Sequence, residues 1–275
     1  MANKKISIVM AYHNRADLLR TTLESYELLY SDIKDSIEIV IVDDSSDDRE
    51  ELTAVLADFS FEFKTDYLDR KDKAIRNPCV PYNMAIKMAE GEYVNLTNPE
   101  NAHLGHIVQD ALARACEDKY LIYACMNLKV KPEDYASLKG HLGRYVEPDP
   151  SQAWYQHSKY SNRLLHFCSV INRKRLLDIG GFDERLADGS GYDDNDLIQT
   201  VVGSGMEIEN IDYPYCAHQP HSRNWDQDST MYNLTIIKDK WGFFPISAWR
   251  LGAEAKQLEE KRARGGAVND FIFKV

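Results

Sequence analysis

The stretch IEIVIVDDSSDD, residues Ile37–Asp48, decides the fold that the sequence predicts. Its first six residues are almost continuously apolar, which is typical of a strand buried on both faces of a parallel sheet. The strand pattern ends at Asp43 and Asp44, and two serines follow. Carboxylates at the end of such a strand can accept hydrogen bonds from a nucleotide base and ribose, although a simple turn also uses Asp and Ser.

Strand and helix patterns alternate on both sides of this stretch. The expected strands are Ile6–Met10, Ile37–Val42, Phe61–Leu68, Tyr93–Leu96 and Tyr120–Leu128, and the expected helices are Leu18–Leu29, Asp48–Leu56, Val80–Ala89 and Leu104–Ala115. This alternation predicts an α/β fold with a mostly parallel, doubly wound sheet flanked by helices. Ligands bind such sheets at the carboxyl ends of the strands, where Asn14, Arg15, Asn98 and Glu100 are expected.

The second half of the chain has a less regular pattern. Lys131–Lys159 is rich in Pro, Gly, His and Tyr without a clear period, which predicts a long functional loop. A strand is expected at Leu164–Ile171, two short strands at Glu207–Ile211 and Tyr213–Ala217, and helices at Thr230–Trp241 and Ala248–Arg262.

Size and composition narrow the class of protein. The 275 residues are 44% hydrophobic and 28% charged, as in ordinary globular proteins, and we find no apolar run that would span a bilayer and no signal peptide. Five cysteines are scattered without a C-x-x-C pair, which favours reduced thiols and a cytoplasmic location. The net charge of −11 disfavours bulk binding to nucleic acid or to anionic membranes.

A second acidic stretch, GGFDERLADGSGYDDNDLI (Gly180–Ile198), has the composition of a reactive site. The apolar spacing after Asp193 and Asp194 predicts that these acids occupy the first turn of a helix. A helix N-terminus favours ionised carboxylates, and an ionised carboxylate on a cleft can take a proton from a hydroxyl. The alternative is that Asp193 only caps the helix and its acidic neighbours are solvated.

Other polar residues can hold a metal ion and phosphate. Glu100 is a candidate ligand for a hard divalent cation, and a nitrogen from His218 or His221 would favour manganese over calcium. An ordinary hydrogen-bonding role is the alternative for either histidine. Arg76, with Lys71 and Lys73 before it, can neutralise phosphate charge, although a solvated basic loop explains these residues nearly as well.

Aromatic and polar residues alternate at Trp154, Tyr155 and His157. Such a mixture suits stacking on a sugar ring and hydrogen bonding to its hydroxyl groups. A buried anchor for the long loop is the alternative reading.

Four blocks of the chain together resemble the GT-A glycosyltransferases, most closely those of family 2. They are SIVMAYHNRADLLRTTLES from Ser7, IVIVDDSSDD from Ile39, NPCVPYNMAIKMAEGEYVNL from Asn77, and the Gly180–Ile198 stretch. The last block resembles the one shared with galactosyl- and N-acetylgalactosaminyltransferases. Each block is a weak signal, but all four occur in the order of the family.

The resemblance implies a GT-A, Rossmann-like fold that binds a nucleotide-sugar donor, with UDP as the expected carrier. Residues in or beside the matched blocks are assigned to the donor: Asn14, Arg15, Asp43, Asp44, Arg76, Asn83 and Asn98. Asn98 and Glu100 would stand at the acidic positions of the family's D-x-D motif, with Mn2+ or Mg2+ held by Glu100 and His218. Asp194 would be the catalytic base, with Asp193 beside it contacting the acceptor. Trp154, Tyr155 and His157 are the candidates for the acceptor.

Two positions depart from the family pattern. Ala11 and Tyr12 replace its usual proline-containing turn. N-P-E (Asn98 to Glu100) replaces D-x-D, which removes one negative charge from the metal site. The cation is therefore expected to bind more weakly, or Arg76 and Lys71 to meet part of the diphosphate charge.

We therefore expect an inverting glycosyltransferase that moves a sugar to an acceptor hydroxyl. Residues 1–225 would form the catalytic domain, with a nucleotide-sugar half at 1–130, an acceptor half at 131–225, and a helical extension at 226–275 packed on it. The alternatives are a retaining transferase, a nucleotidyltransferase on the same fold, or a catalytically weak or dead nucleotide-sugar-binding module. The sequence does not identify the sugar or its acceptor.

Overall fold

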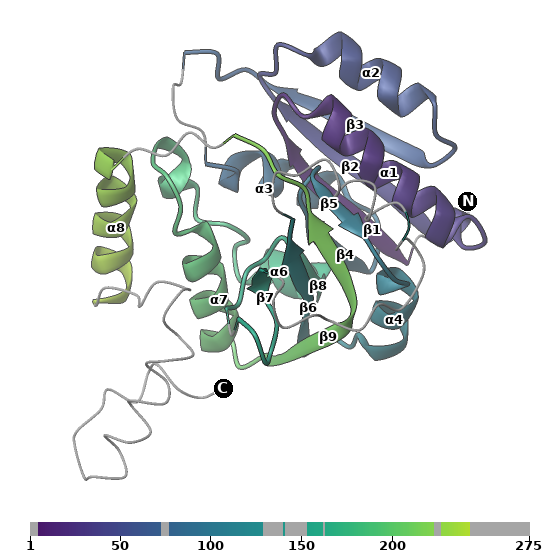
Figure 1. Cartoon of the computed structure of the whole chain (residues 1–275). Helices are drawn as coiled ribbons and strands as arrows, with labels where there is room; N and C mark the ends of the chain where they lie inside the picture. The colour runs from purple at the N-terminus through teal and green to yellow at the C-terminus, as the bar shows by residue number, and fades with distance from the viewer. Residues whose placement is uncertain are drawn as a thin grey trace.

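The fold is a twisted mixed sheet with helices on both faces (Figure 1). A computed structural model describes residues 5–72, 77–128, 140, 153–161, 163–222 and 227–242. Its strands are β1 (Ile6–Tyr12), β2 (Ile37–Asp44), β3 (Glu62–Leu68), β4 (Tyr93–Thr97), β5 (Asn101–His103), β6 (Lys119–Asn127), β7 (Trp154–Gln156), β8 (Cys168–Asn172) and β9 (Glu207–His218). Its helices are α1 (Ala16–Tyr30), α2 (Arg49–Ala57), α3 (Cys79–Met88), α4 (Ile107–Arg114), α6 (Arg173–Asp178), α7 (Asp193–Gly203) and α8 (Gln227–Trp241), with 3₁₀ turns η1 (Lys34–Ser36) and η2 (Glu184–Asp188).

The strand order confirms the predicted class. Over the described residues the nine strands run β3-β2-β1-β4-β8-β6-β9-β5, with β7 paired to β6. The first four strands of this order are parallel. β8 lies antiparallel between β4 and β6, whereas β6 and β9 are parallel again. The parallel half therefore brings the carboxyl ends of β1, β2 and β4 to one edge.

Alternating side chains give the sheet its two apolar layers. In β1, Ile8 and Met10 belong to an apolar cluster that includes residues of α1, α2 and α4, whereas Val9 belongs to a second cluster that includes residues of α3, α6, α7 and α8. All eight residues of β2 are buried, which confirms the prediction for Ile37–Val42 and extends it to Asp43 and Asp44. Glu38, a buried acid near the start of this strand, is paired with Lys64 at 2.7 Å.

The structure corrects four details of the expected element pattern. The short strands β5 and β7 and the helix α6 were not predicted. The two strands expected on either side of Asp212 form one strand, β9, whose register against β6 shifts between Tyr123 and Cys125. This irregularity, at the position of Pro214, interrupts the apolar pattern without ending the strand.

Some predictions lie outside the described residues. They are the helix at Ala248–Arg262, most of the loop at Lys131–Lys159, and the basic residues Lys73 and Arg76. Among the helices that the structure describes, none has the length and apolar character needed to cross a membrane.

Helix α8 is bonded to the acidic stretch at its middle and at its C-terminal end. The Asn233 amide donates to the carbonyl oxygens of Leu186 (3.1 Å) and Gly191 (2.8 Å). The buried Asp196 carboxylate of α7 accepts from Lys240 Nζ and Trp241 Nε1, each at 2.8 Å. In Figure 1, α8 lies beside α7 and away from α2. These bonds connect the first turn of α7 to α8.

Candidate active site

The carboxyl end of β2 presents two buried carboxylates. Asp44 pairs with the Arg70 guanidinium through both oxygens, with the Nε–Oδ1 distance at 2.9 Å. Asp43 Oδ1 accepts the backbone N–H of Ser46 at 2.9 Å. Asp43 Oδ2 is buried, has no hydrogen-bond partner within the described parts of the chain, and lies 4.0 Å from Arg49 Nε. This oxygen therefore keeps an unused hydrogen-bond acceptor position at the strand end.

The turn after β1 is tied to the same edge. Asn14 adopts a positive φ of 51°, and its side-chain oxygen accepts the backbone N–H groups of Asp47 (2.7 Å) and Asp48 (3.3 Å). The next residue, Arg15, points toward the fourth strand, with its Nε 3.4 Å from Glu100 Oε2. The predicted donor-binding residues of the first and second strands therefore share one edge with Glu100.

Glu100 and two histidines form a compact group with metal-ligand chemistry. Glu100 Oε1 lies 3.1 Å from His221 Nε2 and 3.5 Å from His218 Nε2. One ligand atom from each residue lies within 4.8 Å of the others. Burial raises the pKa of Glu100, but the His221 hydrogen bond and the charges of His218 and Arg15 lower it to about 2. Glu100 is therefore an ionised carboxylate beside two imidazoles.

Asp193 and Asp194 begin α7, as predicted, and meet a third residue, His166. Asp194 Oδ1 accepts from the backbone nitrogen of His166 at 2.7 Å and from its ring Nδ1 at 2.6 Å. The second oxygen of Asp193 lies 3.8 Å from the same ring nitrogen. Because Nδ1 carries the donated proton, its lone pair is not available to a metal, which favours acid–base chemistry over metal binding here.

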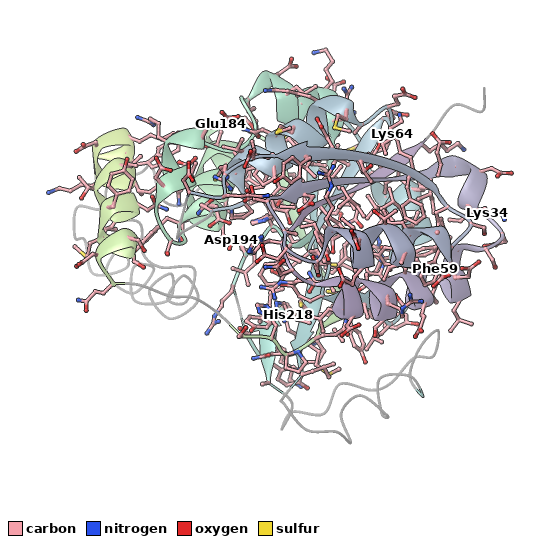
Figure 2. The ribbon with its side chains drawn as sticks, turned by 90° about the horizontal axis from the view of Figure 1, so that it is seen from above. Lys34, Phe59, Lys64, Glu184, Asp194 and His218 are labelled. Carbon is pink, nitrogen blue, oxygen red and sulfur yellow. The ribbon has the colours of Figure 1, made fainter. Side chains whose placement is uncertain are left out.

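Direct contacts connect the two groups. The His166 ring meets the Tyr82 ring edge-on, with the centroids 5.1 Å apart. The Tyr82 hydroxyl lies 2.7 Å from Asn98 Oδ1, and Asn98 Nδ2 lies 3.4 Å from Glu100 Oε1. Burial raises the pKa of Tyr82 well above its ordinary value, and the charges of Glu100, Asp193 and Asp194 add to this effect. In the view of Figure 2, the labels of Asp194 and His218 fall in one part of the molecule, away from those of Lys34 and Phe59.

The three residues that were predicted to contact the acceptor have different surroundings. Tyr155 lies against His218, with ring centroids 4.8 Å apart, and is therefore beside the Glu100 group. Trp154 and His157 pack against each other at 4.6 Å, and Trp154 is also stacked on Tyr160. The structure thus places Tyr155 at the site and gives Trp154 and His157 the surroundings of a packed anchor.

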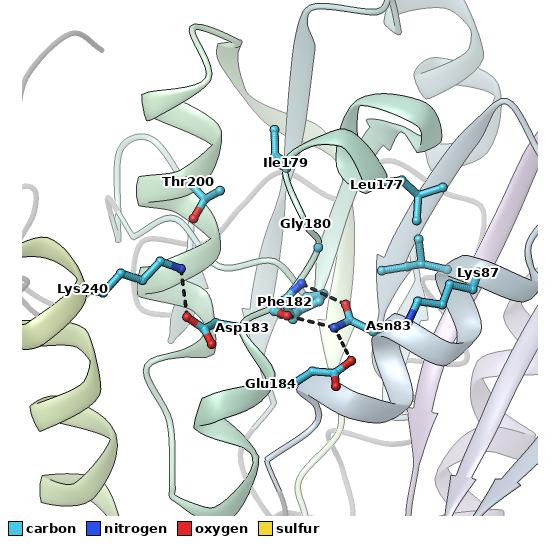
Figure 3. A pocket seen from close by; sticks show the side chains of 12 residues that line it. Asn83, Lys87, Leu177, Ile179, Gly180, Phe182, Asp183, Glu184, Thr200 and Lys240 are labelled. Carbon is cyan, nitrogen blue, oxygen red and sulfur yellow. Dashed lines mark hydrogen bonds and ion pairs between the residues drawn. The ribbon is translucent and has the colours of Figure 1, made fainter.

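Asn83 lines a separate groove on the side of α3, α7 and α8 (Figure 3). Its amide bonds both the nitrogen and the oxygen of Phe182 at 2.9 Å and Glu184 Oε1 at 2.9 Å, which fixes the turn before α7. The groove has a volume of about 560 Å³, and its lining residues include neither Glu100 nor Asp194. Asn83 therefore lies apart from the other predicted donor-binding residues.

Comparison with known families identifies the chain. The model described as "Glycosyl transferase family 2" matches residues 7–178, which is well over half of the sequence. The chain belongs to glycosyl transferase family 2. It therefore has the GT-A fold that its first three sequence blocks indicate. The match ends before Gly180, so the galactosyltransferase-type assignment of the last block stays a prediction.

Solved structures similar to this family 2 chain show the same fold. Residues 1–349 of S. aureus TarS align with a TM-score of 0.56 and 20% identity, over 78% of this chain and 60% of that one. TarS 1–349 in complex with UDP-GlcNAc aligns with a TM-score of 0.57 and 18% identity, over 80% and 60% of the two chains. The chain thus spans 60% of the length of this TarS fragment. No curated protein matches the sequence.

Several site residues were not found from the sequence. His166 lies within the predicted strand Leu164–Ile171 without a motif around it, and its partner Asp194 is 28 positions away, so no local pattern indicates the pair. Arg70 is a similar case, because its bonds to Asp44 and to the Asn77 carbonyl exist only in the folded chain. His221 was weighed as an alternative to His218, and both contact Glu100.

The environment of Asp193 predicts a pH-dependent stability. Burial and the charge of Asp194 raise the pKa of Asp193 to about 6, against the lowering effects of His166 and Asn77. Because the folded pKa exceeds the ordinary value of 3.8, ionised Asp193 destabilises the fold, and stability is lost as pH rises through about 6.

We therefore expect Asp193→Asn to stabilise the protein at pH 7 by roughly 1–3 kcal/mol and to flatten the slope of stability between about pH 4 and pH 6. Urea unfolding at several pH values measures both effects. An unchanged slope in the variant would show that Asp193 titrates normally in the fold.

Proposed function

We propose that this glycosyltransferase moves a sugar from a nucleoside-diphosphate donor, with UDP as the carrier, to an acceptor hydroxyl with inversion at the anomeric carbon. The observation that carries the proposal is the continuous set of contacts from Asp194 through His166, Tyr82 and Asn98 to Glu100. This set brings a candidate base and a candidate diphosphate site, far apart in sequence, into one region.

The strand ends supply the donor site in this proposal. The free oxygen of Asp43 would accept a hydrogen bond from the base or ribose, and Arg15 would face the diphosphate beside Glu100. Asp44 would act together with Arg70, to which it is bonded. The similarity to TarS, whose structure contains UDP-GlcNAc, supports a UDP-sugar.

The Glu100 group fits a divalent cation. Glu100, His218 and His221 offer one carboxylate and two imidazoles, a donor set that suits Mn2+ better than Mg2+. When bound, the cation would neutralise charge on the departing diphosphate and help to orient it. In the N-P-E motif Glu100 supplies the carboxylate, while Asn98 hydrogen-bonds to it instead of adding a second charge.

Asp194 would be the general base. Its Oδ2 would take the proton of the acceptor hydroxyl as the acceptor oxygen attacks the anomeric carbon, and the nucleoside diphosphate would leave with the electron pair of the broken bond. Tyr155, beside His218, would contact the acceptor sugar or its equivalent. Asp193 would lie next to the acceptor and share the negative charge of the site.

The proposed domain organisation separates the donor half from the acceptor half. Residues 1–130 would bind the nucleotide sugar and 131–225 the acceptor, with α8 packed on the second part as the beginning of the helical extension.

The cysteines bear on the cellular location. All five cysteines are free, and four of them are buried, which supports a reducing cytoplasmic setting.

A panel of nucleotide sugars, scored for nucleoside diphosphate release with Mn2+ and with chelator, tests the proposal. We expect UDP release from at least one UDP-sugar, accelerated by Mn2+, and a product whose anomeric configuration is inverted. A retained configuration would exclude the inverting mechanism. Binding of nucleotide sugars without any release across the panel and a set of sugar acceptors would favour a binding module.

A further inference from the structure

His166 holds one oxygen of Asp194 with two donors. The backbone N–H and the ring Nδ1–H both reach Oδ1, at 2.7 and 2.6 Å. Two donors from one residue fix both the position and the plane of a carboxylate, since rotation of the carboxylate would break one of the bonds. Oδ1 is thereby occupied, which leaves Oδ2 as the oxygen that can accept a further proton.

The His166 ring is itself held firmly. The residue is only 2% exposed, and its ring packs edge-on against Tyr82 and Phe182, with centroid distances of 5.1 and 4.9 Å. Its carbonyl oxygen accepts the Ser169 hydroxyl at 2.6 Å, at the start of β8. His166 therefore connects β8, a buried strand, to the first turn of α7.

The charges around the ring favour this arrangement. The titratable groups that face His166 are Asp193 and Asp194 from α7 and the Tyr82 phenol from α3. Burial lowers the pKa of His166, but the charge of Asp194, its hydrogen bond and the charge of Asp193 raise it above the ordinary value. The Nδ1 proton is thus stabilised by the acids that it faces.

We propose that His166 is a positioning residue that orients Asp194 through Nδ1–H, so that Oδ2 alone serves as the proton acceptor in sugar transfer. This inference rests on the proposed function of Asp194. In the step itself, the acceptor O–H proton passes to Oδ2, the acceptor oxygen bonds to the anomeric carbon, and the carbon–oxygen bond to the diphosphate breaks with its electron pair on the leaving group. His166 keeps its own proton throughout.

Two amide variants separate the role of Nδ1 from that of the rest of the ring. The side-chain nitrogen of Asn can take the place of Nδ1, whereas that of Gln takes the place of Nε2 and lies too far along the side chain to reach Oδ1 in the same way. We expect His166→Asn to keep the parent kcat within a few-fold. We expect His166→Gln to lower kcat about 10–100-fold and to leave the KM for the donor unchanged. A loss of this size is typical when the hydrogen-bond partner of a metal ligand is removed, and we expect the same of the partner of a catalytic carboxylate.

The rates are measured as UDP release from the UDP-sugar that the donor panel selects, with UDP-GlcNAc as the first probe. The matched control is His106→Gln, because His106 is exposed before α4 and is expected to leave the rate unchanged. A parent rate in His166→Gln would overturn the inference. Equal losses in the Asn and Gln variants, with both folded by circular dichroism, would also overturn it.

A second measurement does not depend on turnover. NMR titration of ¹⁵N-labelled histidine side chains in the intact chain should show His166 with a pKa above that of an ordinary histidine, and Asp194→Asn should lower it. An unchanged His166 titration in Asp194→Asn would show that the pair is not coupled. If Asp194→Asn instead transfers sugar at the parent rate, the proposed base is wrong, whatever the titration shows.

Discussion

Asp194→Asn is expected to lower the rate of sugar transfer by about 10²–10⁴-fold while leaving donor binding nearly intact, because general-base help typically contributes this factor. The amide oxygen of Asn can still accept both hydrogen bonds from His166, so the side chain keeps its place. The amide nitrogen that replaces Oδ2 cannot accept a proton. The loss should therefore appear in kcat and not in the affinity for the donor.

The measurement is kcat for UDP release with Mn2+, together with the binding of UDP by calorimetry. Asp228→Asn is a matched control, because Asp228 is also an acid on the first turn of a helix but is exposed on α8. Equal kcat values for Asp194→Asn and the parent would remove Asp194 from the mechanism. A fall in UDP affinity equal to the fall in rate would indicate a damaged fold instead.

Glu100→Gln is expected to abolish most of the response to Mn2+. Glu100 is the only carboxylate in the described metal-ligand group that includes His218 and His221, and its pKa of about 2 keeps it ionised at neutral pH. A neutral amide keeps the shape but removes the charge that attracts the cation. We expect Mn2+ affinity to fall at least about tenfold, since even the outer partners of metal ligands contribute that much.

Titrating Mn2+ into parent and variant while UDP release is followed measures this effect. Glu117→Gln, an exposed acid far from the histidines, serves as the control. Identical Mn2+ activation curves would show that the cation binds elsewhere or is not needed. The same variant should lose the stability that ionised Glu100 provides, which is present above pH 4.5 and is lost as pH falls toward 2.

The regular half of the fold was predictable because its physical causes are local. The run Ile37–Val42 had to be buried on both faces, and the structure buries all of it between two helical layers. β5 and β7 have three residues each, too few to produce a recognisable period. β9 was predicted as two strands because Asp212 and Pro214 interrupt the apolar pattern of the sequence. The register of β9 against β6 is irregular at the same place.

The site was predictable only as far as its acids follow strands and helices. Asp43, Glu100 and Asp194 stand at element ends, where local patterns place them. Their partners come from other parts of the chain: His166 precedes β8 and Arg70 follows β3. Whether Trp154 faces a ligand or the core depends on the alternation of a three-residue strand, which the sequence did not reveal.

The bonds from α8 to Asp196 limit how far the nearby carboxylate of Asp194 can move. Asp196 lies on the same helical turn as Asp194, so Lys240 and Trp241 restrain the turn that carries the base and not a remote part of α7. A displacement of α8 would therefore be passed through these bonds to the turn that faces His166. If Asp194 is the base, α8 would thus hold the turn that carries it in place, and the sequence of α8 should tolerate change less well than that of a helix without such bonds.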